Sequence, residues 1–133
     1  MPERQPTPDQ LRHAELLYRR ARSDLTVARK LAADPEVEDG AVAYHVQQAV
    51  EKAVKALLLL HGIEFPRIHD LDALVRLAEE GSVEMSTVFA SIGWLTPWAG
   101  KWRYREAPAA DRAGAIEAGT EALAWCLGVL DSS

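Results

Sequence analysis

Cysteine is almost absent from this sequence. Cys126 is the only one among 133 residues, so no disulfide can form within the chain and no cysteine cluster can hold zinc. The sequence also lacks any run of about 18 apolar residues, the length that a membrane-spanning helix needs. The first ten residues are polar and proline-rich, without the apolar core of a secretion signal. We therefore expect a cytoplasmic protein that does not enter a membrane.

Aromatic residues are few as well, at 7%, although 48% of the residues are hydrophobic. Alanine and leucine dominate that hydrophobic share, and both lose little side-chain freedom in a helix. No segment shows the alternating pattern of a half-buried strand. A chain of this length can build one core, so we expect a single all-α domain over residues 1–133, with residues 1–7 as a flexible tail.

Three long segments have the apolar spacing of amphipathic helices. Apolar residues recur at steps of three and four over 11–32, 42–60 and 116–130. Thr7 and Pro8 predict the start of the first helix, because threonine caps a helix and proline suits its first turn.

Shorter helices are expected between the second and third long ones. Asp70 and Gly81 are a plausible cap and stop for a helix over 71–80. Apolar residues over 88–95 suggest another helix, and Thr96-Pro97 suggests the start of a further short one. Because none of these helices can bury its apolar face alone, we predict an antiparallel up-and-down four-helix bundle with an additional short helix.

The net charge of −5 is unevenly distributed. Residues 1–30 contain seven Lys or Arg against four Asp or Glu, whereas the remainder contains eight against sixteen. A basic first helix can meet a phosphate or an acidic partner, but a solvated helix face is the more common reason for such charge.

The second long helix carries the most informative polar pattern. His45, Gln48, Lys52 and Lys55 are spaced by three, four and three residues, which places them on one helical face beside the apolar stripe. Such a row can bind a phosphate or a carboxylate. It can equally be the charged edge of a bundle helix, in which Glu51 pairs with Lys55 four residues later.

The same helix resembles a known family. The segment from Tyr44 to Leu57 is similar to the signature helix of HEPN-domain proteins, and His61 to Leu71 is similar to that family's next turn and helix start. The resemblance covers roughly residues 14–80. It implies an α-helical bundle that is commonly dimeric and often encoded beside a small nucleotidyltransferase. Many such pairs resemble toxin–antitoxin systems.

Some members of that family are metal-independent ribonucleases that carry an arginine, four to six further residues and then a histidine. This sequence departs from that pattern, because none of its four histidines follows an arginine at that spacing. Lys55 stands six residues before His61, but lysine lacks the planar fork with which arginine grips phosphate. The resemblance thus favours a branch without the ribonuclease motif, and we assign no catalytic residue.

A second polar segment lies where that motif is expected. Arg103, Tyr104 and Arg105 resemble an Arg-Tyr-Pro-like segment of the non-ribonuclease branches, with the proline displaced to Pro108. The two arginines can clamp a phosphate and the tyrosine can stack on a base. Alternatively, Trp98 and its neighbours simply pack while the cations face solvent.

These features predict one ligand site for a nucleotide or phosphate, with no metal ion and no cofactor. Its proposed residues are His45, Gln48, Lys52, Lys55, His69, Arg103, Tyr104 and Arg105. We expect a nucleotide- or RNA-binding module that forms a homodimer and acts with a nucleotidyltransferase partner. The alternatives are a ribonuclease with a degenerate site and a purely structural dimerisation protein. The sequence leaves open whether the protein is an enzyme.

Overall fold

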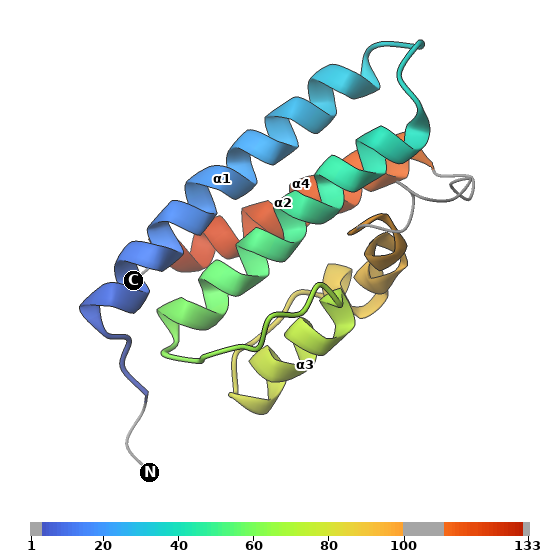
Figure 1. Ribbon diagram of the computed structural model, residues 1–133. Coiled ribbons are helices and arrows are strands. Elements are labelled where there is room, and N and C mark those ends of the chain that lie inside the picture. The colour runs from blue at the N-terminus through green and yellow to red at the C-terminus, as the bar shows by residue number, and fades with distance from the viewer. Residues whose placement is uncertain (1–3, 100–110, 132–133) are drawn as a thin grey trace.

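The computed structural model describes residues 4–99 and 111–131. In chain order the helices are α1 (Pro8–Ala32), α2 (Asp39–Leu60), α3 (Leu71–Glu80), the 3-10 helix η1 (Thr87–Ala99) and α4 (Arg112–Asp131). No strand occurs within the described ranges. The predicted all-α bundle is therefore confirmed (Figure 1).

The start of α1 follows the predicted capping pattern. Thr7 accepts a hydrogen bond from the backbone of Gln10 at 3.1 Å, and the Gln10 side chain accepts one from the Thr7 backbone at 2.8 Å. Pro8 occupies the first turn, where its missing N–H costs nothing. These local bonds satisfy N–H groups that have no partner inside the helix.

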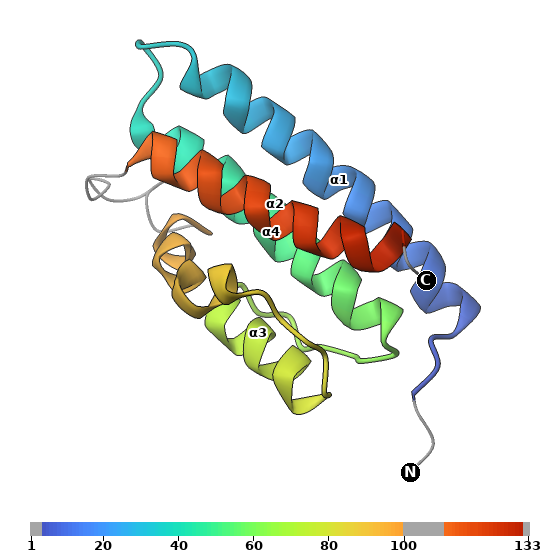
Figure 2. The same cartoon turned by 180° about the vertical axis from the view of Figure 1, so that it is seen from behind.

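Helix α2 is the centre of the bundle and packs against every other helix (Figures 1 and 2). Its contact with α1 is close because small side chains meet there. The fully buried alanines of the two helices are Ala14, Ala21 and Ala28 on α1, and Ala43, Ala49, Ala53 and Ala56 on α2.

Helix α4 runs parallel to α2 and antiparallel to α1. Arg112 lies beside Asp39 at the start of both α4 and α2, and about two turns further on Gly119 lies beside Val46. A Cβ atom on Gly119 would be 2.8 Å from Cγ1 of Val46, so glycine permits the close approach of these helices.

The chain between α2 and α4 differs in detail from the prediction. Extended residues 63–70 return along α2, so that α3 then runs in the same direction as α2 (Figure 1). The return towards α4 is made by η1 rather than by a fourth long helix. The predicted separate helix at Thr96-Pro97 is wrong, because η1 continues through it to Ala99.

The geometry of η1 has a clear cause in its apolar spacing. Its buried side chains, Phe89, Ile92 and Leu95, are three residues apart at each step. A 3-10 helix has three residues per turn, so this spacing places all three on one face, against the core. A kink at Ser91 interrupts the element.

Within the described ranges, no helix combines the length and the apolar character needed to cross a bilayer.

Candidate functional site

The polar face predicted on α2 divides into two clusters. The first, here called the Asp24 cluster, consists of Asp24 from α1 with His45 and Lys52 from α2. Lys52 Nζ lies 2.5 Å from Asp24 Oδ2, and the two side chains are 24% and 22% exposed. This pair joins the middle of α1 to α2 at a partly solvated edge.

His45 lies about two turns before Lys52 on the same side of α2. Its ring meets the ring of Tyr44 edge-on, with centroids 5.1 Å apart. Its Nδ1 atom is buried and has no hydrogen-bond partner among the described residues. Burial lowers the pKa of His45 below the ordinary value, Asp24 opposes this effect and Lys52 adds to it.

The second group, the Glu51 cluster, consists of Gln47, Gln48, Glu51 and Lys55 from α2 with His69 from the segment before α3. Glu51 is its centre and is only 5% exposed. The carboxylate accepts hydrogen bonds from Gln47 Nε2 at 2.9 Å and from Lys55 Nζ at 3.2 Å. His69 Nδ1 lies 3.0 and 3.1 Å from its two oxygens.

The rest of the cluster holds these groups in place. Gln48 Nε2 donates to Gln47 Oε1 at 2.7 Å, which orients the buried Gln47 amide. Lys55 Nζ also lies 5.5 Å from the centre of the Phe65 ring, a favourable position for a cation. The His69 side chain is 68% exposed, so the cluster reaches from the core to the surface.

The connection that carries His69 is fixed at both ends. Asp70 caps α3 by accepting from the backbone N–H of Ala73 at 3.2 Å, as the sequence predicts. The N–H of Leu71 donates to Thr96 Oγ1 at 3.2 Å, so η1 supports the start of α3. The position of His69 thus depends on α2, α3 and η1 together.

The predicted site residues are therefore only partly brought together. His45 and Lys52 lie in the Asp24 cluster, whereas Gln48, Lys55 and His69 lie in the Glu51 cluster. Arg103, Tyr104 and Arg105 lie outside the described residues. Their predicted place beside these clusters therefore stays a prediction.

Sequence reasoning missed the importance of Glu51, Gln47 and Asp24. Glu51 was predicted only as a pairing partner of Lys55, and Gln47 was not among the predicted site residues, although both are buried. The available signal was the repeat of polar residues at 47, 51 and 55, four residues apart at each step along the same helix. Asp24 belongs to a different helix, so its contact with Lys52 could not be read from the spacing.

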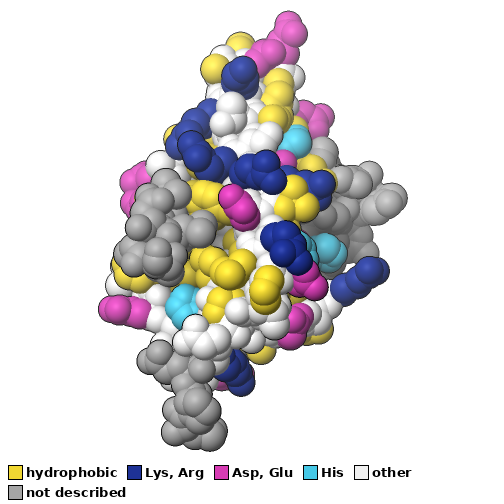
Figure 3. All heavy atoms as spheres, turned by 90° about the vertical axis from the view of Figure 1, so that its left-hand side faces the viewer, with side chains coloured by type: hydrophobic (Ala, Val, Ile, Leu, Met, Phe, Trp, Pro, Cys, Tyr) yellow, Lys and Arg dark blue, Asp and Glu magenta, His cyan; other side chains and the backbone are white. Residues whose placement is uncertain are grey.

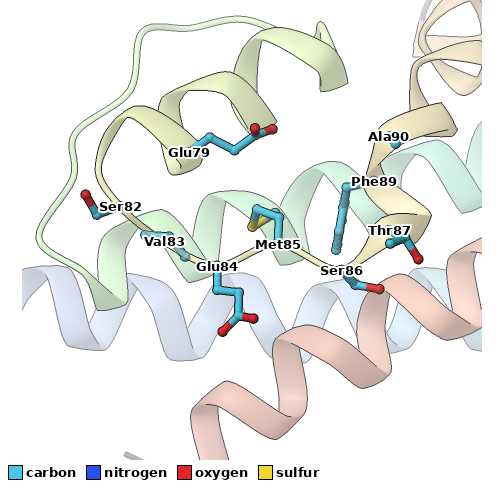
Figure 4. A pocket seen from close by; sticks show the side chains of 9 residues that line it. All are labelled: Glu79, Ser82, Val83, Glu84, Met85, Ser86, Thr87, Phe89 and Ala90. Atoms are coloured by element: carbon cyan, nitrogen blue, oxygen red, sulfur yellow. The ribbon is translucent and has the colours of Figure 1, made fainter.

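A hollow beside α3 does not suit a phosphate. It has a volume of about 480 Å³ and lies between α3 and the segment leading to η1 (Figure 4). Glu79, Glu84 and three hydroxyl groups line it, and no Lys or Arg is among its described lining residues. Within the described ranges, no group of three His, Cys, Asp or Glu side chains can hold a metal ion.

The outer face of α1 is basic, as the uneven charge predicts. Figure 3 shows Lys and Arg side chains gathered on this side of the molecule, with apolar side chains between and below them. The exposed cations of α1 are Arg12, Arg19, Arg20, Arg22, Arg29 and Lys30. Arg12 pairs with Asp9, and Arg29 donates to Thr120 at 3.1 Å.

The helical bundle and the signature pattern on α2 define the class of protein. Residues 14–126 match the family model of the HEPN domain, and the chain belongs to the HEPN family.

One curated relative is a protein of Methanocaldococcus jannaschii named "Putative toxin MJ1304". The two sequences are 47% identical over 57 residues, which cover 43% of this chain and 36% of that protein. The chain thus spans little more than a third of this relative's length. No solved structure matches the chain.

Proposed function

We propose that this HEPN protein binds the phosphates of RNA or of a nucleotide at the edge of α2 that carries the Asp24 and Glu51 clusters. It does so as one half of a toxin–antitoxin-like pair, beside a small nucleotidyltransferase. The observation that carries this proposal is the buried carboxylate of Glu51, held by Gln47 and Lys55 within an apolar core.

A buried ionic network is a poor means of stabilising a bundle. Removing charges from water costs several kcal/mol per ion, and well-packed apolar residues of similar size often serve stability as well or better. Groups whose geometry is fixed at such a cost are more frequent at functional sites than elsewhere. The Glu51 cluster therefore supports a ligand site more strongly than the spacing of charges alone.

The chemistry of the edge suits a phosphate. An ammonium group has three N–H donors, and the bond to Asp24 uses one of those on Lys52. The same holds for Lys55, whose bond to Glu51 holds the side chain in place. Each lysine can donate to a phosphate oxygen without leaving its carboxylate, so little side-chain freedom is lost on binding.

The proposed pairing rests on the family and on the relative. The resemblance to this family implies a toxin–antitoxin-like pair, and the relative carries the name "Putative toxin MJ1304". Helix α1 offers an exposed surface on which a partner can dock, because Leu16 and Val27 are 36% and 37% exposed on its outward side among its arginines. A homodimer through this surface is the other use that we propose for it.

Binding is tested by titrating fluorescein-labelled RNA and a fluorescent ATP analogue into the full chain. Lys52→Gln and Lys55→Gln are each expected to weaken binding several-fold. Each should also reduce the slope of log affinity against log salt concentration by about one. Arg76→Gln on the outer side of α3 removes one exposed charge and should leave affinity unchanged. Unaltered affinity in both lysine variants would exclude this edge as the site.

The pairing needs a separate experiment. Co-expression with the protein encoded next to it should yield a stable complex, and growth arrest by one component should be relieved by the other. Separate elution of the two proteins, with no effect on growth, would contradict the pairing while leaving ligand binding untouched.

A ribonuclease with a degenerate site is the second candidate, and the contact between Glu51 and His69 favours it. A carboxylate that orients a histidine is a common arrangement for proton transfer. This candidate predicts RNA cleavage in the presence of a metal chelator and loss of that cleavage in His69→Ala. Equal cleavage by the wild type and His69→Ala would exclude His69 as the catalytic histidine.

A further inference from the structure

The neighbours of His69 determine which of its ring nitrogens donates a hydrogen bond and which accepts one. Gln48 Nε2 donates to Gln47 Oε1 at 2.7 Å, so the amide nitrogen of Gln47 points the other way. That nitrogen donates to Glu51 Oε1 at 2.9 Å. The chain of donors therefore ends on Glu51, which can only accept.

In the hydrogen bond between Glu51 and His69, the histidine must then be the donor. Glu51 already accepts from Gln47 and from Lys55, as an ionised carboxylate does. His69 Nδ1, at 3.0 and 3.1 Å from the two carboxylate oxygens, is the donor. In neutral imidazole only one nitrogen carries hydrogen, so Nε2 of His69 is left as an acceptor.

This acceptor is available to a ligand. Nδ1 faces the buried carboxylate and Nε2 lies across the ring from it, on a side chain that is 68% exposed. Lys55 and His69 both contact the carboxylate of Glu51. A cation that can bind a phosphate therefore lies on the same cluster as Nε2. The pair thus offers a phosphate donor and a hydroxyl acceptor close together.

We infer that His69 is the residue by which this site selects ribonucleotides over deoxyribonucleotides, through a hydrogen bond from a ribose 2′-hydroxyl to Nε2. The inference rests on the proposed function, since it assigns the sugar class of the ligand bound at this edge. The 2′-hydroxyl is the group that distinguishes RNA from DNA, and it lies next to a phosphate in the nucleotide chain. Glu51 is a positioning residue that holds the ring in the accepting state.

The test compares two short labelled single strands of identical base sequence, one RNA and one DNA with uracil in place of thymine. The titrations are carried out at pH 8, above the ordinary histidine pKa of about 6.5. The wild type should bind RNA about 3- to 10-fold more tightly than DNA, the usual effect of one hydrogen bond. His69→Phe, which keeps a ring but has no acceptor, should weaken RNA binding more than DNA binding, so that the ratio of the two affinities falls to about one.

His13→Phe is the matched control, because His13 is also exposed but lies on α1. It should retain the RNA preference of the wild type. A preference for RNA that persists in His69→Phe, or an equal loss for RNA and DNA, would overturn the inference and leave the phosphate site in place. Absence of binding to either strand by the wild type would instead remove the proposed function, and the inference with it.

A second measurement does not depend on the ligand. Nitrogen chemical shifts of the imidazole groups at pH 8 should show hydrogen on Nδ1 of His69. Hydrogen on Nε2 instead would remove the acceptor and contradict the inference, whatever the affinities.

Discussion

Arg112 and Asp39 form an ion pair that ties the start of α4 to the start of α2. Arg112 Nε lies 2.5 Å from Asp39 Oδ1, and the same guanidinium donates to the backbone carbonyls of Ala32, Asp34 and Val37. These carbonyls belong to the end of α1 and the loop after it, where helices leave acceptors without partners. One side chain therefore joins three helices.

Replacing Arg112 should destabilise the bundle even when the charge is kept. Arg112→Lys is expected to lower the free energy of unfolding by about 1–3 kcal/mol, because one ammonium cannot reach acceptors that the planar guanidinium spans. Urea unfolding followed by circular dichroism measures the change. Arg76→Lys, an exposed substitution of the same kind on α3, should change stability little, and an equal effect in both variants would refute the special role of Arg112.

Single and double substitutions of the Glu51–Lys55 pair can distinguish its contribution to stability from its contribution to ligand binding. Lys55→Met leaves the buried Glu51 carboxylate without its lysine and should lower the free energy of unfolding by roughly 2–4 kcal/mol. The double change Glu51→Leu with Lys55→Met removes both charges and should recover much of that stability. It should also abolish nucleotide or RNA binding. A double variant that still binds as tightly as the wild type would show that the Glu51 and Lys55 charges are not part of the binding site.

His45 should make the protein less stable in mild acid. Its pKa is lowered mainly because the ring is removed from water. In the unfolded chain the histidine binds its proton at the ordinary pKa of 6.5, so below that pH the unfolded state holds more protons than the folded state. Its contribution therefore lowers stability as pH falls from about 6.5 towards the folded-state pKa.

Unfolding free energies at several pH values between 7 and 5 test this contribution. The wild type should lose more stability over this range than His45→Gln, which does not titrate. The difference should stay below about 1 kcal/mol, because the ring is only half-buried and solvent screens its charge. Parallel curves for the two proteins would show that His45 titrates alike in both states.

The sequence predicts those parts of the fold that depend on neighbours along the chain. The capping box of Thr7 and the cap at Asp70 are local bonds across three residues, and both occur as expected. The apolar periods of α1, α2 and α4 also specify helices without reference to other elements. The type of η1 was missed because its spacing of three was read as an approximate α-helical period.

The candidate site is predictable only in part, for a related reason. Spacing along α2 places His45, Lys52 and Lys55 on one side of the helix, and the structure agrees. It does not reveal which residues meet them from other elements. Asp24 lies 28 residues before its partner Lys52, and His69 lies 18 residues after its partner Glu51. These contacts divide the single predicted row into two clusters.

Cys126 provides a probe of how tightly the bundle closes. The residue lies in α4 with only 1% of its surface exposed, and burial raises the pKa of its thiol to about 12. At pH 8 roughly one thiol in ten thousand is then ionised, and only the thiolate attacks disulfide reagents. The folded protein should therefore react far more slowly with such a reagent than free glutathione does.

Reaction of Cys126 should follow opening of the fold instead. Adding urea ought to accelerate labelling in proportion to the unfolded fraction, and Arg112→Lys ought to label faster than the wild type because its bundle opens more often. The rate of release of the coloured thiol measures this directly. Rapid labelling of the native wild type, at a rate independent of urea, would mean that α4 leaves its thiol accessible and that the core around Cys126 is open to solvent.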